Sequence, residues 1–130
     1  MLELGDTRRN QKGMKLQKWI APLALAIILA AAPVGRSQEP RRIEIGINRF
    51  SYSPSEITLK KGEPVILVLT SHDVTHGLAI SEFGLRKDVV GGQTAELAFT
   101  PMRTGTFEGR CSYFCGPGHT SMILKINVVE

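Results

Sequence analysis

Short runs of alternating apolar and polar side chains fill residues 41–130, and this alternation is the feature that most constrains the fold. In the first run, Ile43, Ile45 and Ile47 fall on one face of a strand with a period of two residues. Gly and Pro separate the runs, and none of these residues shows a sustained helical period with caps. The pattern predicts an all-β domain, either an antiparallel sandwich or a barrel.

About seven strands are expected, and residues 51–54 are expected to form a turn. The strands are predicted within residues 41–50, 55–60, 65–71, 75–81, 94–100, 105–111 and 122–130. A sandwich of this size can bury a core of its own. The candidate core residues are Phe50, Ile57, Leu59, Ile66, Val68, Phe99, Ile126 and Val128.

The first part of the chain has the composition of a targeting segment. Lys15 and Lys18 precede an uncharged apolar run at residues 19–34, and a polar, turn-prone stretch follows it. The run is short for a membrane-spanning helix, so a signal cleaved after Ser37 and a retained membrane anchor both fit. We therefore expect residues 1–37 to be a signal peptide or anchor, with residues 38–130 as a domain on the oxidising side of a membrane.

The positive charge of the chain lies in this first segment. Residues 1–37 carry six basic and two acidic side chains, whereas residues 38–130 carry ten of each. The predicted domain is therefore neutral, and it has no basic stripe with interleaved aromatic residues, which argues against nucleic-acid binding. It also has no Ser-His-Asp set, paired-carboxylate motif or phosphate-binding loop, so no catalytic site of its own is apparent.

Four potential metal ligands are close together near the end of the chain, in the stretch CSYFCGPGHTSM. Cys111 and Cys115 would by default form a disulfide in an exported protein, but so short a loop gains little chain entropy from a bridge. His119 and Met122 follow within seven residues of the second cysteine, and His76 is a further ligand expected at the start of a strand. Thiolate, thioether and imidazole together favour copper, whereas a thioether is an unusual zinc ligand.

The ligand set allows one copper ion or two. His76, Cys115, His119 and Met122 would suffice for a mononuclear blue-copper site, with the methionine as a weak axial ligand. Cys111 would then be surplus. As a second thiolate on the same loop, it can instead bridge two copper ions together with Cys115.

The spaced set Cys-x3-Cys-x3-His-x2-Met, with the upstream histidine in DVTHG, resembles the binuclear copper (CuA) cupredoxin domain of cytochrome c oxidase subunit II and of nitrous oxide reductase. The stretch FSYSPSEITLKKGEPVILVLTSHDVTHGLAI resembles the family's strands and first-ligand region, so the resemblance covers residues 43–130. It implies a cupredoxin-like Greek-key β-sandwich that contains a CuA centre of two copper ions.

The resemblance also implies a role for each ligand. Cys111 and Cys115 would be the bridging thiolates, and His76 would bind one copper with Met122 as its weak ligand. His119 would bind the other copper, with the backbone carbonyl of Tyr113 as its weak ligand. In many oxidase subunits a Glu stands in place of this tyrosine and serves a metal site shared with the catalytic subunit.

The implied function is one-electron transfer, by a stand-alone carrier or by a short subunit II-like component of a respiratory oxidase. Expected partners are a redox donor such as a c-type cytochrome and, for a subunit, an oxidase catalytic subunit. The expected location is the periplasm or the outer face of the cytoplasmic membrane, with membrane association possible through residues 19–34. Two alternatives remain open: copper delivery or storage by the same ligands, and a metal-free disulfide between Cys111 and Cys115.

Overall fold

The computed structural model describes residues 35–130, which form a compact unit of their own. The predicted signal or anchor at residues 1–37 lies almost wholly outside the described residues, and the domain boundary after residue 37 stays a prediction. Among residues 35–130, no helix is long and apolar enough to cross a membrane. Their only helical elements are two short 3-10 helices, η1 (Ser81–Phe83) and η2 (His119–Ser121).

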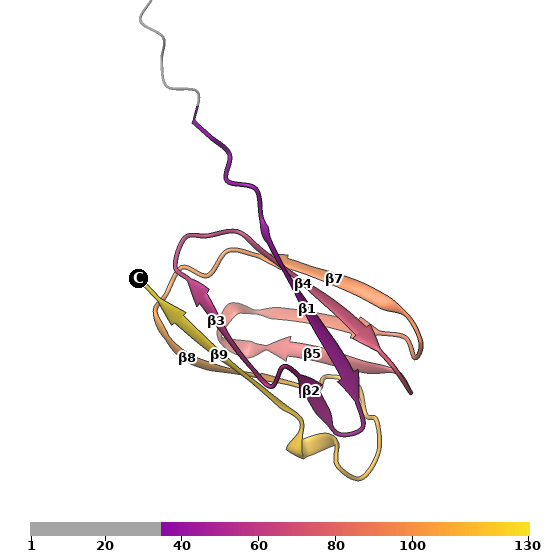
Figure 1. Ribbon diagram of the computed structural model, residues 1–130. Coiled ribbons are helices and arrows are strands. Elements are labelled where there is room, and N and C mark those ends of the chain that lie inside the picture. Colours follow the sequence, from indigo (N-terminus) through magenta and orange to yellow (C-terminus); the bar gives the residue numbers. More distant parts are fainter. Residues whose placement is uncertain (1–34) are drawn as a thin grey trace, which may run out of the picture. The chain divides into compact units, whose positions relative to one another are not determined.

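Nine strands in the described domain form two layers (Figure 1). One sheet has the order β2-β1-β4-β7, and its strands are β1 (Arg41–Asn48), β2 (Ser51–Ser53), β4 (Val65–Ser71) and β7 (Thr94–Phe99). The other has the order β3-β9-β8-β5-β6, with β3 (Glu56–Lys60), β5 (His76–Ile80), β6 (Leu85–Val89), β8 (Gly105–Arg110) and β9 (Ile123–Val129). The predicted all-β sandwich is therefore confirmed.

The sandwich is mixed rather than purely antiparallel, which corrects the prediction. Strand β1 runs parallel to β4, with Ile43 opposite Leu67, and β3 runs parallel to β9, with Ile57 opposite Ile126. The chain repeatedly crosses from one sheet to the other, so strands that are neighbours in sequence are often not neighbours in a sheet. Because of these crossings, some neighbouring strands run in the same direction. A pattern of alternating side chains does not reveal the direction in which two strands pair.

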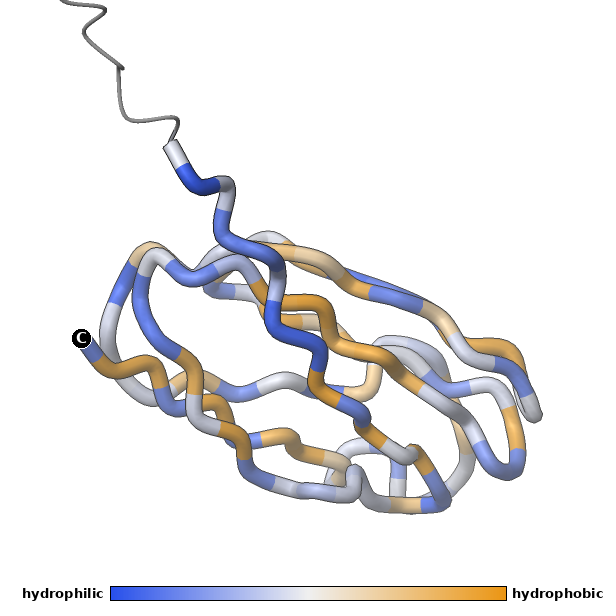
Figure 2. Tube along the Cα trace, turned by 45° about the horizontal axis from the view of Figure 1, so that its top comes forward, coloured by the Kyte–Doolittle hydropathy of each residue, from blue (hydrophilic) through white to orange (hydrophobic). Residues whose placement is uncertain are grey.

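The core lies between the two sheets, and apolar residues recur along the strands with polar ones between them (Figure 2). Four predicted core residues belong to it: Ile57, Leu59, Ile126 and Val128. Val68 is buried on the outer face of β4, where Glu44 and Glu96 flank it on the neighbouring strands. The other three predicted core residues are half-buried: Phe50, Ile66 and Phe99.

Two strands were not predicted. Residues 51–53 form β2 rather than a turn, because Tyr52 points into the core while the residues on either side of it are exposed. Strand β6 forms the edge of the second sheet and pairs only with β5 in it. Its three central residues are charged and exposed, so it lacks the apolar alternation by which strands are recognised.

The central strand β4 is expected to dominate the stability of the domain. Leu67 is fully buried and lies between Ile43 of β1 and Leu97 of β7. Leu67→Ala should lower the free energy of unfolding by about 2–5 kcal/mol, because it removes buried methyl groups and leaves a cavity. Chemical denaturation checks this, with Val129→Ala at a half-exposed position of β9 as the control. Similar losses in the two variants would contradict this account of the core.

Candidate metal centre

Two strand ends in the same sheet bring the predicted ligands together. Strand β5 begins at His76, and β8 ends at Arg110, directly before Cys111. The two strands are antiparallel with Ala79 opposite Arg110, so the start of β5 extends past the end of β8 toward the loop that follows it. His76 and Cys111, which are 35 residues apart in sequence, therefore become neighbours.

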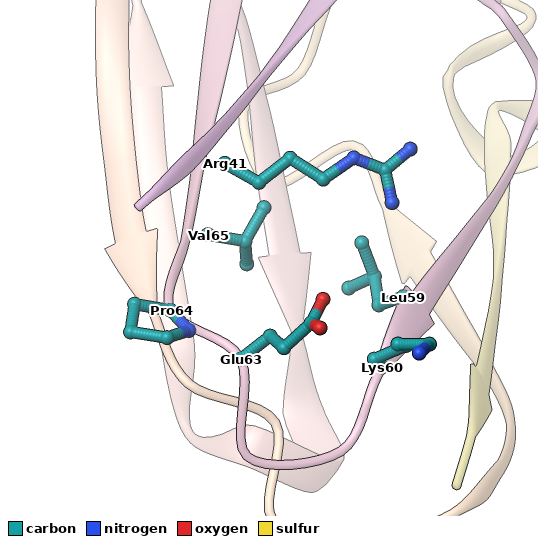
Figure 3. A pocket seen from close by; sticks show the side chains of 6 residues that line it. All are labelled: Arg41, Leu59, Lys60, Glu63, Pro64 and Val65. Atoms are coloured by element: carbon teal, nitrogen blue, oxygen red, sulfur yellow. The ribbon is translucent and has the colours of Figure 1, made fainter. Parts of the chain in front are cut away.

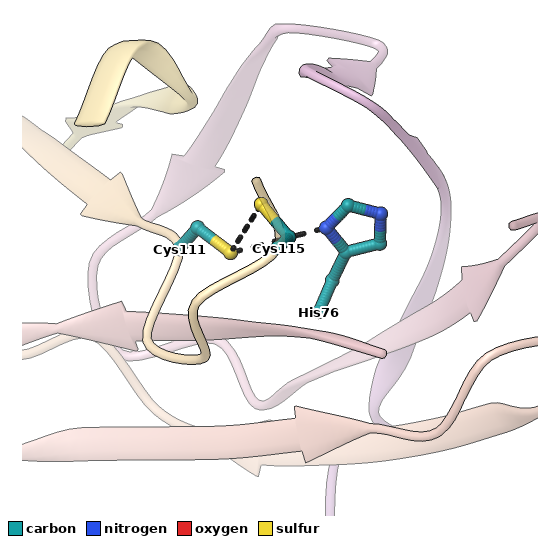
Figure 4. A group of neighbouring side chains, drawn as sticks. All are labelled: His76, Cys111 and Cys115. Carbon is teal, nitrogen blue, oxygen red and sulfur yellow. Dashed lines mark hydrogen bonds between the residues drawn. The ribbon is translucent and has the colours of Figure 1, made fainter. Parts of the chain in front are cut away.

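His76, Cys111 and Cys115 point toward one another at this end of the sandwich (Figure 4). One ligand atom from each lies within 4.8 Å of the other two, and all three side chains are buried. The two Sγ atoms are 3.8 Å apart, and neither cysteine is in a disulfide. Nδ1 of His76 lies 3.9 Å from Sγ of Cys111.

The other predicted ligands surround the second cysteine. Nδ1 of His119 lies 3.7 Å from Sγ of Cys115, and Sδ of the fully buried Met122 lies 3.4 Å from the same sulfur. The carbonyl oxygen of Tyr113 lies 3.2 Å from Sγ of Cys111. The structure therefore brings all six predicted site residues together, although His119 is half-buried and lies outside the tighter group of three.

The donor atoms fit copper in kind and in spacing. A nitrogen and a sulfur that bind one ion at about 2.0 and 2.3 Å lie roughly 3.5–3.9 Å apart, in agreement with both histidine–cysteine distances. The distance between the two cysteine sulfurs is shorter than two metal–thiolate bonds of about 2.3 Å each, so one ion can contact both. Thiolate, thioether and imidazole are soft or borderline ligands, which suits copper better than a hard cation.

The ligand loop, residues 111–122, turns back on itself through two glycines. Gly116 has a φ of +136°, which side-chain-bearing residues rarely adopt, and its carbonyl accepts a hydrogen bond from the amide of His119. A Cβ atom on Gly118 would lie only 2.3 Å from the ring of Phe50. Residues 116–118 therefore form a tight turn that requires glycine at both ends.

Asp73 fixes the orientation of the His76 ring. Oδ1 of this carboxylate lies 2.6 Å from Nε2 of His76, and the backbone amides of Arg49 and Val74 donate further hydrogen bonds to the carboxylate. Partial burial alone would raise the pKa of Asp73, but these hydrogen bonds outweigh it and lower the pKa to about 2. Because the ionised carboxylate holds the proton on Nε2, Nδ1 is left free to bind a metal.

Burial also affects the second cysteine of the pair. It raises the pKa of the Cys115 thiol to about 11, and the neighbouring Cys111 adds to this effect. In the metal-free protein at neutral pH, Cys115 therefore carries a proton, which metal binding must release.

Two other features lie apart from the ligands. His72 is exposed and its ring packs over Gly46. A small pocket at the opposite end of the sandwich is shown in Figure 3, and its space suits one water molecule. Its lining residues are Arg41, Leu59, Lys60, Glu63, Pro64 and Val65.

The sequence did not reveal several supporting contacts. Ser112 donates a 2.9 Å hydrogen bond to Asp88, which ties the ligand loop to β6. The Phe114 ring is 74% exposed and lies 5.6 Å from the ring of His119, on the solvent side of the site. The first contact joins residues that are distant in sequence, and the second involves a phenylalanine, which does not bind metals. The spacing of metal ligands therefore could not identify either contact.

Comparison with known proteins decides the family. Residues 39–129 match the family described as cytochrome c oxidase subunit II, periplasmic domain. The chain belongs to this family. Membership implies a copper-binding, cupredoxin-like domain with an extracytoplasmic location, and the buried group of His76, Cys111 and Cys115 provides a possible copper site.

Individual relatives agree with the family. The chain is 42% identical over 72 residues to a probable cytochrome c oxidase subunit 2 of Streptomyces avermitilis, covering 55% of this chain and 23% of that protein. It is 32% identical over 95 residues to cytochrome c oxidase subunit 2 of Cereibacter sphaeroides, covering 71% of this chain and 31% of that protein. The chain thus matches less than a third of the length of either relative.

A solved structure supports the fold. The periplasmic domain of subunit II of cytochrome oxidase of Bradyrhizobium japonicum superposes with a TM-score of 0.63 at 23% identity, covering 69% of this chain and 84% of that one. At this identity the likeness is one of fold, and it confirms the cupredoxin-like sandwich.

The Asp73 carboxylate should stabilise the metal-free protein in a pH-dependent way. Because its pKa is lowered from 3.8 to about 2, its stabilising contribution is present above pH 4 and is lost as the pH falls toward 2. Asp73→Asn should lower the free energy of unfolding by about 1–3 kcal/mol at pH 7, and the difference should shrink below pH 4. Denaturation across this pH range checks it, with Glu63→Gln as the control. A difference that stays constant down to pH 2 would contradict the assignment.

Proposed function

We propose that the domain is an electron-transfer module with a binuclear CuA copper centre. The observation that carries the proposal is the pairing of two unbonded, buried cysteines 3.8 Å apart, each with a histidine Nδ1 within 4 Å of its sulfur. A mononuclear site would leave one of these thiols surplus. With two ions, Cys111 and Cys115 would both serve as ligands, and neither thiol would be surplus.

The remaining ligands are assigned as the resemblance implies. His76 and the weak ligand Met122 would hold one copper, and His119 and the carbonyl oxygen of Tyr113 would hold the other. Met122 and His76 are fully buried, so the first position is shielded from water. His119 is half-buried and lies beside the exposed Phe114 ring, whereas His76 is fully buried. An electron that leaves the centre through His119 therefore has the shorter path to a partner at the surface.

The protein's contribution is to hold its ligands still. A thiolate-bridged copper pair supplies one-electron redox chemistry with the unpaired electron shared between both ions. His76 is fixed by Asp73 and by its place in β5, and the ligand loop is anchored at one end by β8 and at the other by β9. A ligand set that fills the coordination positions and moves little favours electron transfer over catalysis, since a catalytic metal keeps an open position.

The wider assignment follows from the family. We propose that the domain works in a respiratory oxidase as a subunit II-like component, in contact with a catalytic subunit, and accepts electrons from a redox protein such as a c-type cytochrome. Its place would be the periplasm or the outer face of the cytoplasmic membrane. The relatives are named as oxidase subunits, which supports this role. The comparisons do not favour copper delivery or storage.

Copper counting tests the proposal. The reduced protein should bind two copper ions, and Cys111→Ser should bind one, because a serine hydroxyl does not bridge copper as a thiolate does. Cys115→Ser should bind fewer than Cys111→Ser, since Cys115 also lies beside His119 and Met122. Metal analysis after removal of loosely bound copper provides the measurement.

Two results would contradict the binuclear assignment. One copper in the unchanged protein, with no loss in Cys111→Ser, would indicate a mononuclear site in which that cysteine is surplus. No reactive thiol in the native protein, together with no bound copper, would indicate the disulfide alternative.

A further inference from the structure

The β1–β2 hairpin contributes no metal ligand, yet it contacts both segments that do. The two segments are residues 73–77, which contain His76, and the ligand loop, residues 111–122. We propose that residues 49–53 of this hairpin, which we call the hairpin scaffold, set the positions of both segments, with Phe50 and Tyr52 as positioning residues. In Figure 1 the ligand loop and η2 lie beside this hairpin at the same end of the sandwich.

The first connection leads to His76. The backbone amide of Arg49 donates a 2.7 Å hydrogen bond to Oδ2 of Asp73, and the other oxygen of this carboxylate bonds to the His76 ring. The hairpin scaffold thus holds the carboxylate through the oxygen that does not contact the imidazole. Since this bond comes from the backbone, it depends on the path of the turn rather than on the arginine side chain.

The second connection passes through the core beneath the site. Tyr52 is 2% exposed, and its hydroxyl donates a 2.6 Å hydrogen bond to the carbonyl of Gly77, the residue that follows His76. Tyr52 belongs to one sheet and Gly77 to the other, so this bond joins the two layers directly behind the ligand. Burial raises the pKa of Tyr52, and the nearby Cys111 and Cys115 add to this effect.

The third connection leads to the ligand loop. Both glycines of the turn lie against the Phe50 ring: an added Cβ atom would be 2.3 Å from it at Gly118 and 3.1 Å at Gly116. The backbone between Cys115 and His119 therefore lies flat on this ring. The ring determines how far the loop can fold inward, and through it the distance between the second cysteine and its histidine.

If Phe50 and Tyr52 served only to pack the core, a different result would be expected. Their loss would then weaken the whole domain evenly and leave the ligands in place. Phe99 is a suitable comparison because it is also half-buried and packs against the core. It is the last residue of β7 and lies opposite Val65, the first residue of β4, away from the ligands.

Hydrogen exchange in the metal-free, reduced full chain tests the loop contact without copper. In Phe50→Leu, the amides of His119, Ser121 and Met122, which donate hydrogen bonds within the loop, should exchange about tenfold faster relative to those of β9. Phe99→Leu should change the exchange rates of the loop amides and of the β9 amides by the same factor. If Phe50→Leu also raises the exchange rates of the loop amides and the β9 amides by the same factor, the proposal is overturned.

Copper retention tests the Tyr52 contact. Tyr52→Phe keeps the ring and removes only the hydroxyl, so the fold is retained while Gly77 loses its partner. A chelator should remove copper about 10- to 100-fold faster from this variant, with an altered copper spectrum, whereas Phe99→Leu should match the unchanged protein. An unchanged spectrum and release rate in Tyr52→Phe would overturn the role of this residue.

The copper-retention experiment rests on the proposed function, whereas the hydrogen-exchange experiment does not. If the protein binds no copper, the proposed function fails, and the exchange result still decides whether the hairpin scaffold positions the loop.

Discussion

The antiparallel alignment of β5 with β8 is the constraint on which the rest of the site depends. It brings the side chain of His76, the first residue of β5, close to that of Cys111, the first residue after β8. No local interaction could bring these residues together across 35 positions of sequence. The remaining ligands then follow within one short loop, so this long-range pairing brings all of them to the same end of the sandwich.

The site is built from groups that are costly to bury unless they are paired. The His76 ring is bonded to Asp73, and the Tyr52 hydroxyl to the carbonyl of Gly77. Among the described residues, no buried side-chain nitrogen or oxygen lacks a hydrogen-bond partner. A fully paired network of this kind makes the ligand positions rigid before any metal arrives. Rigid ligands suit a centre that changes oxidation state without changing shape, which connects the packing of the domain to the proposed electron transfer.

Much of the architecture could be predicted from the sequence, and the exceptions have physical reasons. Alternation predicted the strands that bury one face, whereas the polar edge strand β6 and the three-residue β2 carried too little of this pattern. The five candidate ligand side chains were found because metal chemistry restricts both residue type and spacing, whereas the backbone carbonyl of Tyr113 was assigned only through the family resemblance. The contacts of Phe50 and Tyr52 could not be found in this way, since an aromatic residue in a strand ordinarily indicates core packing. Their significance depends on the crossing of the chain between sheets.

The most direct test of the central claim is the electron paramagnetic resonance spectrum of the protein loaded with copper and oxidised by one electron. One unpaired electron shared between two equivalent copper nuclei produces a seven-line hyperfine pattern, and this is the result that the account predicts. A four-line pattern from a single copper nucleus would contradict it and would leave Cys111 without a role in binding copper.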